Sequence, residues 1–317
     1  MSDSPEKKPD WERSVLEKVA LAAINEQRTA RRWGLFFKMM LLIYLFALLF
    51  VGMGWFGKRD SLPGAHTALI DISGVISAGS QASADKIMSG LQAAFKDSGT
   101  KGVVIRINSP GGSPVQAGYI YDEIKRLRAK HPEIPLYAVV EDICASGGYY
   151  IAAAADQIYV DKASIIGSIG VLMDGFGFTG TMEKLGVERR LLAAGENKGF
   201  LDPFSPIQNN QKAHAETMLG DIHQQFITVV KQGRGKRLKE TPDMFSGLLW
   251  VGQKSIDLGL ADALGGLDYV AREVIKAEDI VDYTMQENFA ERFARRFGAA
   301  TAETLVRLTG LNGFSLR

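Results

Sequence analysis

The sequence predicts an α/β fold for the larger part of the chain, because two kinds of segment alternate from residue 67 onward. Continuous apolar runs such as GVVIRIN (102–108) and LYAVVEDI (136–143) are typical of strands that are covered on both faces of a sheet. Each run is followed by a glycine-rich turn and then by a segment with helical spacing, around 115–130 and from Gly147 onward. This alternation predicts a largely parallel sheet flanked by helices.

The composition suits an ordinary globular protein, and neither its charge nor its cysteine content indicates a nucleic-acid or zinc-binding protein. The 317 residues are 46% hydrophobic and 23% charged, which is enough to bury a core. The net charge of +1 gives no electrostatic attraction to a polyanion, so no nucleic-acid partner is expected. Cys144 is the single cysteine and cannot form an intramolecular disulfide, and no histidine and cysteine cluster has zinc spacing. The cysteine and histidine count alone leaves the metal content undetermined, and no metal or cofactor site is predicted.

An uncharged apolar run near the N-terminus predicts a membrane anchor. Residues 39–56 form 18 positions without a charge, and a helix rising about 1.5 Å per residue covers most of a hydrocarbon core of about 30 Å. Trp33 and Trp55 lie where aromatic belts form. A cleaved signal peptide is the alternative, but the preceding polar region is too long and no small-x-small cleavage site follows the run. We expect an uncleaved transmembrane helix.

The charges on either side of this run predict its orientation. Positive side chains are more numerous before it than after it, namely Arg28, Arg31, Arg32 and Lys38 against Lys58 and Arg59. By the positive-inside rule the N-terminus lies in the cytoplasm, and the rest of the chain lies on the far side of the membrane. Residues 10–32 also have apolar positions at roughly helical spacing, which indicates either a helix lying on the membrane surface or a plain cytoplasmic extension.

These features divide the chain into five segments. They are a cytoplasmic N-terminal segment (1–38), a transmembrane helix (39–56), a linker (57–66), the α/β domain (67–285) and a C-terminal tail (286–317).

The last third of the chain is predicted to be mainly helical. A long helix is expected over about 208–232, with shorter ones near Lys254 and Leu267. In the tail, phenylalanines recur every four residues beside arginines, which predicts an amphipathic stripe. That stripe contacts lipid or a neighbouring subunit, or else the segment is a plain packing helix or a loose tail. The aromatic positions are Phe289, Phe293 and Phe297.

Two glycine-rich turns at the ends of predicted strands are the candidate sites of chemistry. The turn NSPGGS (108–113) presents backbone N–H groups that, with the helix start after it, would stabilise an oxyanion. A plain tight turn is the alternative. The turn CASGG (144–148) places Ser146 between a buried strand and a helix, with its hydroxyl exposed as a nucleophile requires. The alternative is that Ser146 is a helix N-cap.

A nucleophilic serine needs a general base, and lysine is a better candidate here than histidine. The histidines are His66, His131, His214 and His223. None lies between residues 132 and 213. A lysine base must be buried so that its pKa falls by several units from about 10.4. Lys198 follows a strand-like run and lies between Gly195 and Gly199, which permits such burial, although a surface lysine has similar neighbours.

Taken together, these motifs resemble those of the signal peptide peptidase A family. INSPGG, ASGGYYIAAAAD, IIGSIGV and the lysine strand occur in the family's order and with similar separations, over about residues 67–271. The resemblance implies an α/β fold shared with caseinolytic protease and the crotonases, built of repeated strand-strand-helix units. It implies Ser146 as the nucleophile and Lys198 as the general base, with Ser168 hydrogen-bonded to the lysine amine. The implied backbone donors of the oxyanion hole are Gly112 and Gly147.

The same resemblance implies a substrate, a location and an assembly. Family members degrade remnant signal peptides left in the membrane, which suits an enzyme anchored in the bacterial inner membrane with a periplasmic or extracytoplasmic catalytic domain. The short members carry one copy of the domain, as this chain does, and form closed homo-oligomers with sites near subunit junctions. We therefore expect a cyclic assembly and apolar peptide-binding pockets. Glu196 is predicted to point away from Lys198, because a nearby carboxylate raises a lysine pKa.

Other functions remain as alternatives. A caseinolytic-type protease needs a histidine after the serine, in the stretch where this sequence has none, and it usually lacks an anchor. A crotonase-like acyl-CoA enzyme uses similar oxyanion geometry without an acyl-enzyme. A noncatalytic membrane scaffold has no reason to keep both Ser146 and Lys198. The sequence does not separate general signal peptide clearance from a peptidase for one membrane partner, and it does not decide whether Ser109 or Ser113 contributes.

Overall fold

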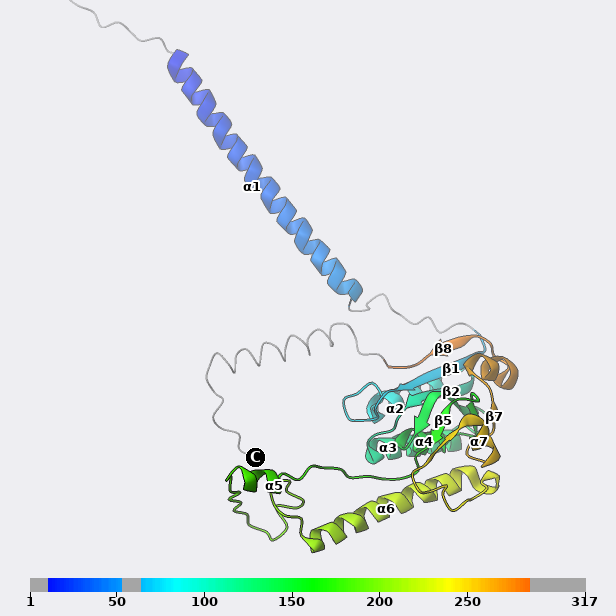
Figure 1. Ribbon diagram of the computed structural model, residues 1–317. Helices are drawn as coiled ribbons and strands as arrows, with labels where there is room; N and C mark the ends of the chain where they lie inside the picture. Colours follow the sequence, from blue (N-terminus) through cyan, green and yellow to red (C-terminus); the bar gives the residue numbers. More distant parts are fainter. Residues whose placement is uncertain (1–10, 53–63, 286–317) are drawn as a thin grey trace, which may run out of the picture. The chain divides into compact units, whose positions relative to one another are not determined.

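The structure of the protein is a computed structural model that describes residues 11–52 and 64–285 (Figure 1). The chain divides into two units, one that contains the N-terminal helix and one that contains the sheet, and each is described by itself. The predicted amphipathic tail (286–317) and most of the predicted linker (57–66) lie outside the described residues.

The first unit contains one long helix, α1 (Trp11–Gly52). Its 42 residues span about 63 Å at 1.5 Å per residue, roughly twice the thickness of a hydrocarbon core. Residues 14–50 are long and apolar enough to cross a membrane, and none of the side chains in the most apolar window is buried. The segment before the predicted span is therefore continuous with it as one helix, which the sequence pattern did not resolve. The predicted residues 53–56 of the span lie outside the described part.

The second unit is built on an eight-stranded sheet with the order β6-β5-β3-β2-β1-β8; in addition, β4 pairs with β3, and β7 pairs with β4. All strand pairs are parallel except β5 with β6. The strands are β1 (His66–Ser73), β2 (Thr100–Ser109), β3 (Leu136–Ala145), β4 (Gln157–Val160), β5 (Ile165–Gly167), β6 (Leu249–Val251), β7 (Ala263–Leu264) and β8 (Ile280–Asp282). The predicted α/β class is confirmed.

Helices connect most of the successive strands, whereas β4 and β5 are joined by a short turn. They are α2 (Ala84–Lys96), α3 (Pro114–Lys130), α4 (Gly147–Ala152), α5 (Thr179–Lys184), α6 (Asn209–Arg234), the short 3₁₀ turn Gly235–Arg237, α7 (Gly252–Asp257), α8 (Leu267–Tyr269) and the π-helical turn Val270–Ile275. The helices predicted over 115–130 and 208–232 thus form within two residues of their expected bounds. Figure 1 shows α2, α3 and α4 gathered on one side of the sheet, with α6 beyond them.

The two faces of the sheet have cores of different size. Strand side chains alternate between faces, so Ile70 and Ile105 enter the large core under α2, α3 and α4. Their neighbours Leu69 and Val104 enter a small core against Val270 on the other face. Burial on both faces explains why β1 to β3 read as continuous apolar runs.

A buried ion pair attaches the C-terminal end of α6 to the β4 and β7 end of the sheet. The side chain of Arg234 is fully buried and forms two hydrogen bonds of 2.8 Å to the Asp262 carboxylate. Arg237 adds a third contact at 3.1 Å, and Asp262 also accepts from the N–H of Ile158 in β4 at 2.7 Å. Burial alone raises the pKa of Asp262, but these hydrogen bonds and positive charges outweigh it, and the pKa lies below its ordinary value.

Replacing Asp262 with asparagine is expected to lower the free energy of unfolding by about 3 kcal/mol at pH 7, because Arg234 stays buried without a counter-charge. A depressed carboxylate pKa stabilises the folded state above the unfolded value near 3.9, and this stabilisation is lost as pH falls through the folded value. The deficit of the variant should therefore shrink below about pH 4. Urea unfolding of the full chain in detergent measures it, with the exposed Asp257→Asn as control. If Asp262→Asn lowers the free energy of unfolding equally at pH 7 and below about pH 4, the stabilising role of the Asp262 carboxylate is contradicted.

Between β5 and α6 the chain leaves the sheet as a long arm, residues 171–208 (Figure 1). Its single helix, α5, has no buried residue. Many of its large apolar side chains are exposed: Leu172, Met173, Phe176, Phe178, Leu185, Val187, Leu191, Leu192, Phe204 and Ile207. The strand predicted before Lys198 does not form, because residues 187–194 lie in this arm without a neighbouring strand to pair their backbone.

Candidate active site

Ser146 lies at the junction that the sequence predicted, directly after β3 and before α4. Its φ is +50°, a backbone conformation that costs free energy for a residue with a side chain and that clusters at functional sites. Its N–H donates to the Gly167 carbonyl at 2.9 Å, and its carbonyl accepts from the N–H of Tyr150 at 2.9 Å. The hydroxyl makes no capping hydrogen bond to α4. Ser146 is therefore held as a half-buried, unengaged hydroxyl, and the alternative of a helix N-cap is not observed.

The turn NSPGGS lies against the Ser146 turn because β2 and β3 are neighbours that pair up to Ser109 and Cys144. Gly111 and Gly112 have φ values of +99° and +149°. A Cβ on Gly111 would lie 2.7 Å from both the Gly147 nitrogen and the Ser146 Cβ. Only glycine allows so close an approach of the two backbones, which is the physical reason for the double glycine in this motif.

Two backbone N–H groups are free beside the Ser146 hydroxyl. Within the described residues, neither the Gly112 nor the Gly147 N–H donates a hydrogen bond to another part of the protein. The two residues are close, because a Cβ on Gly147 would lie 3.3 Å from the Gly112 nitrogen. Free N–H groups beside a serine hydroxyl can stabilise the oxyanion of an acyl-transfer reaction. The structure thus brings together Ser146, the predicted nucleophile, with Gly112 and Gly147, the two predicted oxyanion donors.

The hydroxyls of two neighbouring serines form hydrogen bonds within or next to this turn. The Ser109 hydroxyl is buried, donates to the Gly74 carbonyl at 2.6 Å and accepts from the Gly111 N–H at 3.1 Å. The Ser113 hydroxyl accepts from the Gln116 N–H at 3.4 Å and so caps α3. Both hydroxyls are therefore engaged in hydrogen bonds of the local backbone, whereas the Ser146 hydroxyl is not.

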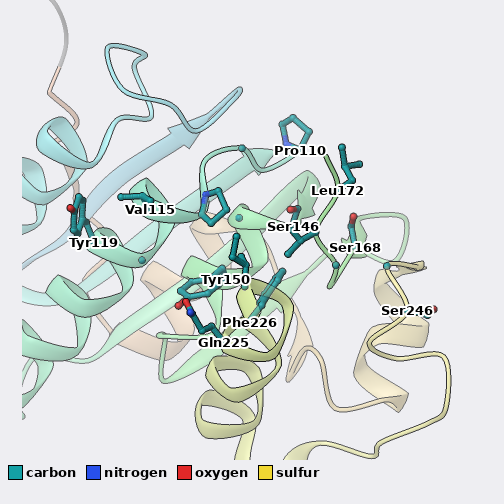
Figure 2. A pocket seen from close by; sticks show the side chains of 18 of the residues that line it. Pro110, Val115, Tyr119, Ser146, Tyr150, Ser168, Leu172, Gln225, Phe226 and Ser246 are labelled. Carbon is teal, nitrogen blue, oxygen red and sulfur yellow. The ribbon is translucent and has the colours of Figure 1, made fainter. Parts of the chain in front are cut away.

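Ser168 lies beside Ser146 because β5 pairs with β3, with Gly167 opposite Ala145. It has a φ of +52°, and its N–H donates to the Leu248 carbonyl at 2.7 Å. Figure 2 shows both serines in the wall of one cavity. The sequence prediction of a second serine at the site is consistent with this placement.

The cavity that contains these serines has a volume of about 960 Å³. Its walls are mostly apolar and aromatic, with Val115 and Tyr119 from α3, Tyr150 from α4, Leu172 from the arm and Phe226 from α6 (Figure 2). A space of this size and chemistry suits an extended apolar peptide segment. The sequence alone did not assign these residues to a cavity wall. Phe226, for example, lies 80 positions after Ser146, and in the sequence it is only one apolar position of an amphipathic helix.

Lys198 is not brought to this cavity within one copy of the chain. It lies exposed in the arm, in a turn where its N–H donates to the Gly195 carbonyl at 3.0 Å, and it is not among the described residues that line the cavity. The burial that a neutral lysine requires is therefore not provided by one copy, which corrects the expectation of a buried setting. In the described chain no ion pair joins Glu196 to Lys198, and the predicted orientation of the Glu196 side chain stays a prediction.

One histidine lies nearer to the site than its sequence position suggested. His223 in α6 is hydrogen-bonded through Nε2 to the carbonyl of Ile169, the residue after Ser168, at 3.1 Å. Among the residues that the structure describes, however, no histidine lines the cavity. In the same described ranges no group of three or more His, Cys, Asp or Glu side chains is arranged to hold a metal ion.

Comparison with known families agrees with this geometry. A family described as peptidase family S49 matches residues 128–281, the part that contains Ser146, Ser168 and Lys198. The chain belongs to peptidase family S49. The Clp protease family also matches this S49 chain, over residues 58–165, which contain the NSPGGS and CASGG turns. The predicted signal peptide peptidase A family and its caseinolytic-protease-like fold are confirmed by these two matches.

Individual relatives of this S49 chain match part of their own length. A protein of Enterococcus faecium, named as a candidate signal peptide peptidase SppA, is 30% identical over 193 residues, which is 61% of this chain and 55% of that protein. The chloroplastic serine protease SPPA of Arabidopsis thaliana is 28% identical over 219 residues, or 68% of this chain and 32% of that one.

A third relative has a name of another kind. The Na(+)/H(+) antiporter NhaA of Brucella melitensis is 46% identical over 177 residues, which is 56% of this S49 chain but 24% of the antiporter. The alignments with these three relatives thus cover between 24% and 55% of each relative. The match covers only about a quarter of the antiporter, and the name describes that whole protein and not the matched segment.

Proposed function

We propose that the protein is a membrane-anchored serine endopeptidase that degrades apolar peptides, with remnant signal peptides as its substrate. The observation that carries the proposal is the geometry at Ser146: an unengaged hydroxyl on a strained backbone, beside two free N–H groups, in a cavity with apolar walls. These are the parts that acyl transfer needs, namely a nucleophile, oxyanion donors and a substrate cleft.

The reaction follows from these parts. The Ser146 Oγ attacks the carbonyl carbon of the scissile peptide bond while a general base accepts its proton. The oxyanion of the tetrahedral intermediate accepts hydrogen bonds from the N–H groups of Gly112 and Gly147. The base then returns the proton to the leaving amine, and water hydrolyses the resulting acyl-enzyme by the same steps.

The general base in this proposal is Lys198 of a neighbouring copy of the chain. Lys198 is exposed in the arm and outside the Ser146 cavity, so one copy supplies the nucleophile without its base. The arm carries ten exposed large apolar side chains, far more than an isolated surface loop ordinarily shows. Packing the arm of one copy against the cavity of the next would bury these side chains and desolvate the lysine, which lowers its pKa.

Head-to-tail contacts of this kind close into a ring when the rotation between copies allows it, so the proposal includes a cyclic homo-oligomer. The hydroxyl of Ser168, which lies beside Ser146, would orient the incoming lysine amine. It would do so by accepting a hydrogen bond from the amine or by donating one to it.

Anchoring places the enzyme where its substrate is left behind. In this proposal α1 crosses the bacterial inner membrane with its N-terminus in the cytoplasm, as the arginines before the apolar segment indicate. The sheet domain then lies on the periplasmic or extracytoplasmic side. A signal peptide has an apolar segment of 7–15 residues in general, which matches the apolar walls of the cavity.

The full chain in detergent is expected to cleave a synthetic signal peptide, with a rate that rises along a pH limb between about pH 7 and 10, below the ordinary lysine value near 10.4. A histidine base has an ordinary pKa near 6.5, so a limb in that range would indicate a histidine instead of a lysine. Initial rates from pH 5 to 10 measure the limb, and a serine-directed phosphonate with mass spectrometry identifies the modified residue. Absence of both cleavage and labelling at Ser146 would reject the proposal in favour of a crotonase-like or noncatalytic protein.

A further inference from the structure

The Ser146 cavity has one charged side chain among the described residues that line it. Asp122 is the only Asp, Glu, Lys or Arg in its wall, and every other lining residue is neutral. Asp122 lies on α3, four residues after Gly118 and eight after Pro114. Residues at this spacing share one face of a helix, and all three line the cavity. Pro114 begins this helix next to Gly112. Asp122 therefore lies about 12 Å along the cavity from the oxyanion turn.

Asp122 has no partner among the residues that the structure describes. In the described part of the chain its exposed carboxylate forms neither a hydrogen bond nor an ion pair, whereas the adjacent Glu123 is paired with Arg126 at 2.7 Å. Its charge acts on the cavity wall, because the pKa of Tyr150 is raised first by burial and next by the Asp122 carboxylate. An unpaired charge at one end of an otherwise neutral cavity favours a ligand with the opposite charge at that end.

We propose that Asp122 determines specificity by binding a positively charged group of the substrate peptide, the side chain of a lysine or arginine, two to four residues from the scissile bond. The spacing follows from the helix: about 12 Å corresponds to nearly four residues of an extended peptide at about 3.3 Å per residue, and the length of the basic side chain shortens this count. The inference rests on the proposed peptidase function and adds to it the position of a charge.

The chemistry of a signal peptide fits such a cavity. Its positive charges lie at one end of its apolar segment, so a substrate with apolar residues against Tyr150 and Phe226 and a basic residue at Asp122 spans the boundary between the two regions. Cleavage is thereby directed to that boundary and not to the middle of the apolar segment.

The test uses the full chain in detergent and a set of fluorogenic apolar peptides that differ at one position. Lysine, norleucine or glutamate is placed in turn at each of the four positions on either side of the scissile bond, and kcat and KM are measured separately. The variants are Asp122→Asn, Asp122→Lys and, as matched control, Asp221→Asn. Asp221 is an exposed carboxylate on α6 that lies in an adjoining groove with Tyr150 and Gln225 but does not line the cavity.

The wild type is expected to prefer lysine over norleucine by about fivefold in kcat/KM at one of these positions, mainly through KM, and less at high salt. Asp122→Asn should bring this ratio close to one, Asp122→Lys should reverse it in favour of glutamate, and Asp221→Asn should keep the wild-type ratio.

Two results would overturn the inference alone: cleavage of the norleucine peptide by the wild type without any charge preference, or the same preference in Asp122→Asn as in the wild type. A change in oligomer size with Asp122→Asn at an unchanged ratio would assign the carboxylate to a contact between copies, which also overturns it. Failure of the wild type to cleave every peptide would instead reject the peptidase function on which the inference rests.

Discussion

Replacing Ser146 with alanine is expected to lower kcat/KM for peptide cleavage by about 10⁴-fold, because the variant lacks the hydroxyl that is proposed to form the acyl-enzyme. Ser109 and Ser113 are both engaged in hydrogen bonds of the neighbouring turn. The fold should remain intact, since alanine retains the Cβ that packs at Gly111 and removes only a hydroxyl without a capping hydrogen bond. Cleavage rates together with thermal unfolding measure the two effects separately.

A matched control for this substitution is Ser89→Ala. Ser89 is exposed on α2, and its hydroxyl donates to the Asp85 carbonyl at 2.7 Å, away from the cavity. It should retain wild-type activity. Near-normal cleavage by Ser146→Ala would show that the nucleophile lies elsewhere, and a large loss of thermal stability in that variant would assign Ser146 a structural role.

Lys198→Ala alone is expected to be inactive, yet a mixture of Lys198→Ala and Ser146→Ala chains should regain activity if serine and lysine come from different copies. When the two chains assort at random in equal amounts, about a quarter of the sites combine an intact serine with an intact lysine. The mixture should therefore reach about a quarter of the wild-type rate after the chains are dissociated and reassembled together. Peptide cleavage and the mass of the assembly are measured on the same sample.

Two outcomes of the mixing experiment would contradict the proposed origin of the base. If both single variants are inactive and the mixed assemblies stay inactive, the lysine reaches Ser146 within its own copy, by a movement of residues 171–208. If Lys198→Ala keeps its activity, the base is another group, and His223→Gln becomes the informative variant because His223 contacts the residue next to Ser168. Neither result would alter the assignment of Ser146.

Much of the sheet and the serine side of the site follow from local sequence signals. The strands β1 to β3 read as apolar runs because both of their faces are buried, and α3 and α6 begin and end close to their predicted bounds. The two glycine-rich turns were recognisable because positive φ and close backbone approach leave glycine as the residue that fits. Parallel pairing of neighbouring strands then brings the turns together without further information.

In the arm, residues 171–208, the prediction of a strand from local sequence was wrong. Leu191 and Leu192 before Lys198 have the composition of a strand, but a strand requires partners for its backbone groups, and the described chain offers none there. The same apolar residues that suggested a buried strand are exposed, and Leu192 is 97% exposed. Their composition is explained if a neighbouring copy covers the arm, which is a property of the assembly and not of the local sequence.

By itself, the sequence determined the α/β class, the family, the apolar N-terminal segment and the position of Ser146, because each depends on residue types at short and regular spacing. Only the tertiary structure decided that α1 is one continuous helix, that Phe226 and Asp122 share a cavity with Ser146, and that Lys198 lies outside it. The physical reason is that a cavity is formed by side chains from elements far apart in the chain, whose packing is set by the burial of the whole core.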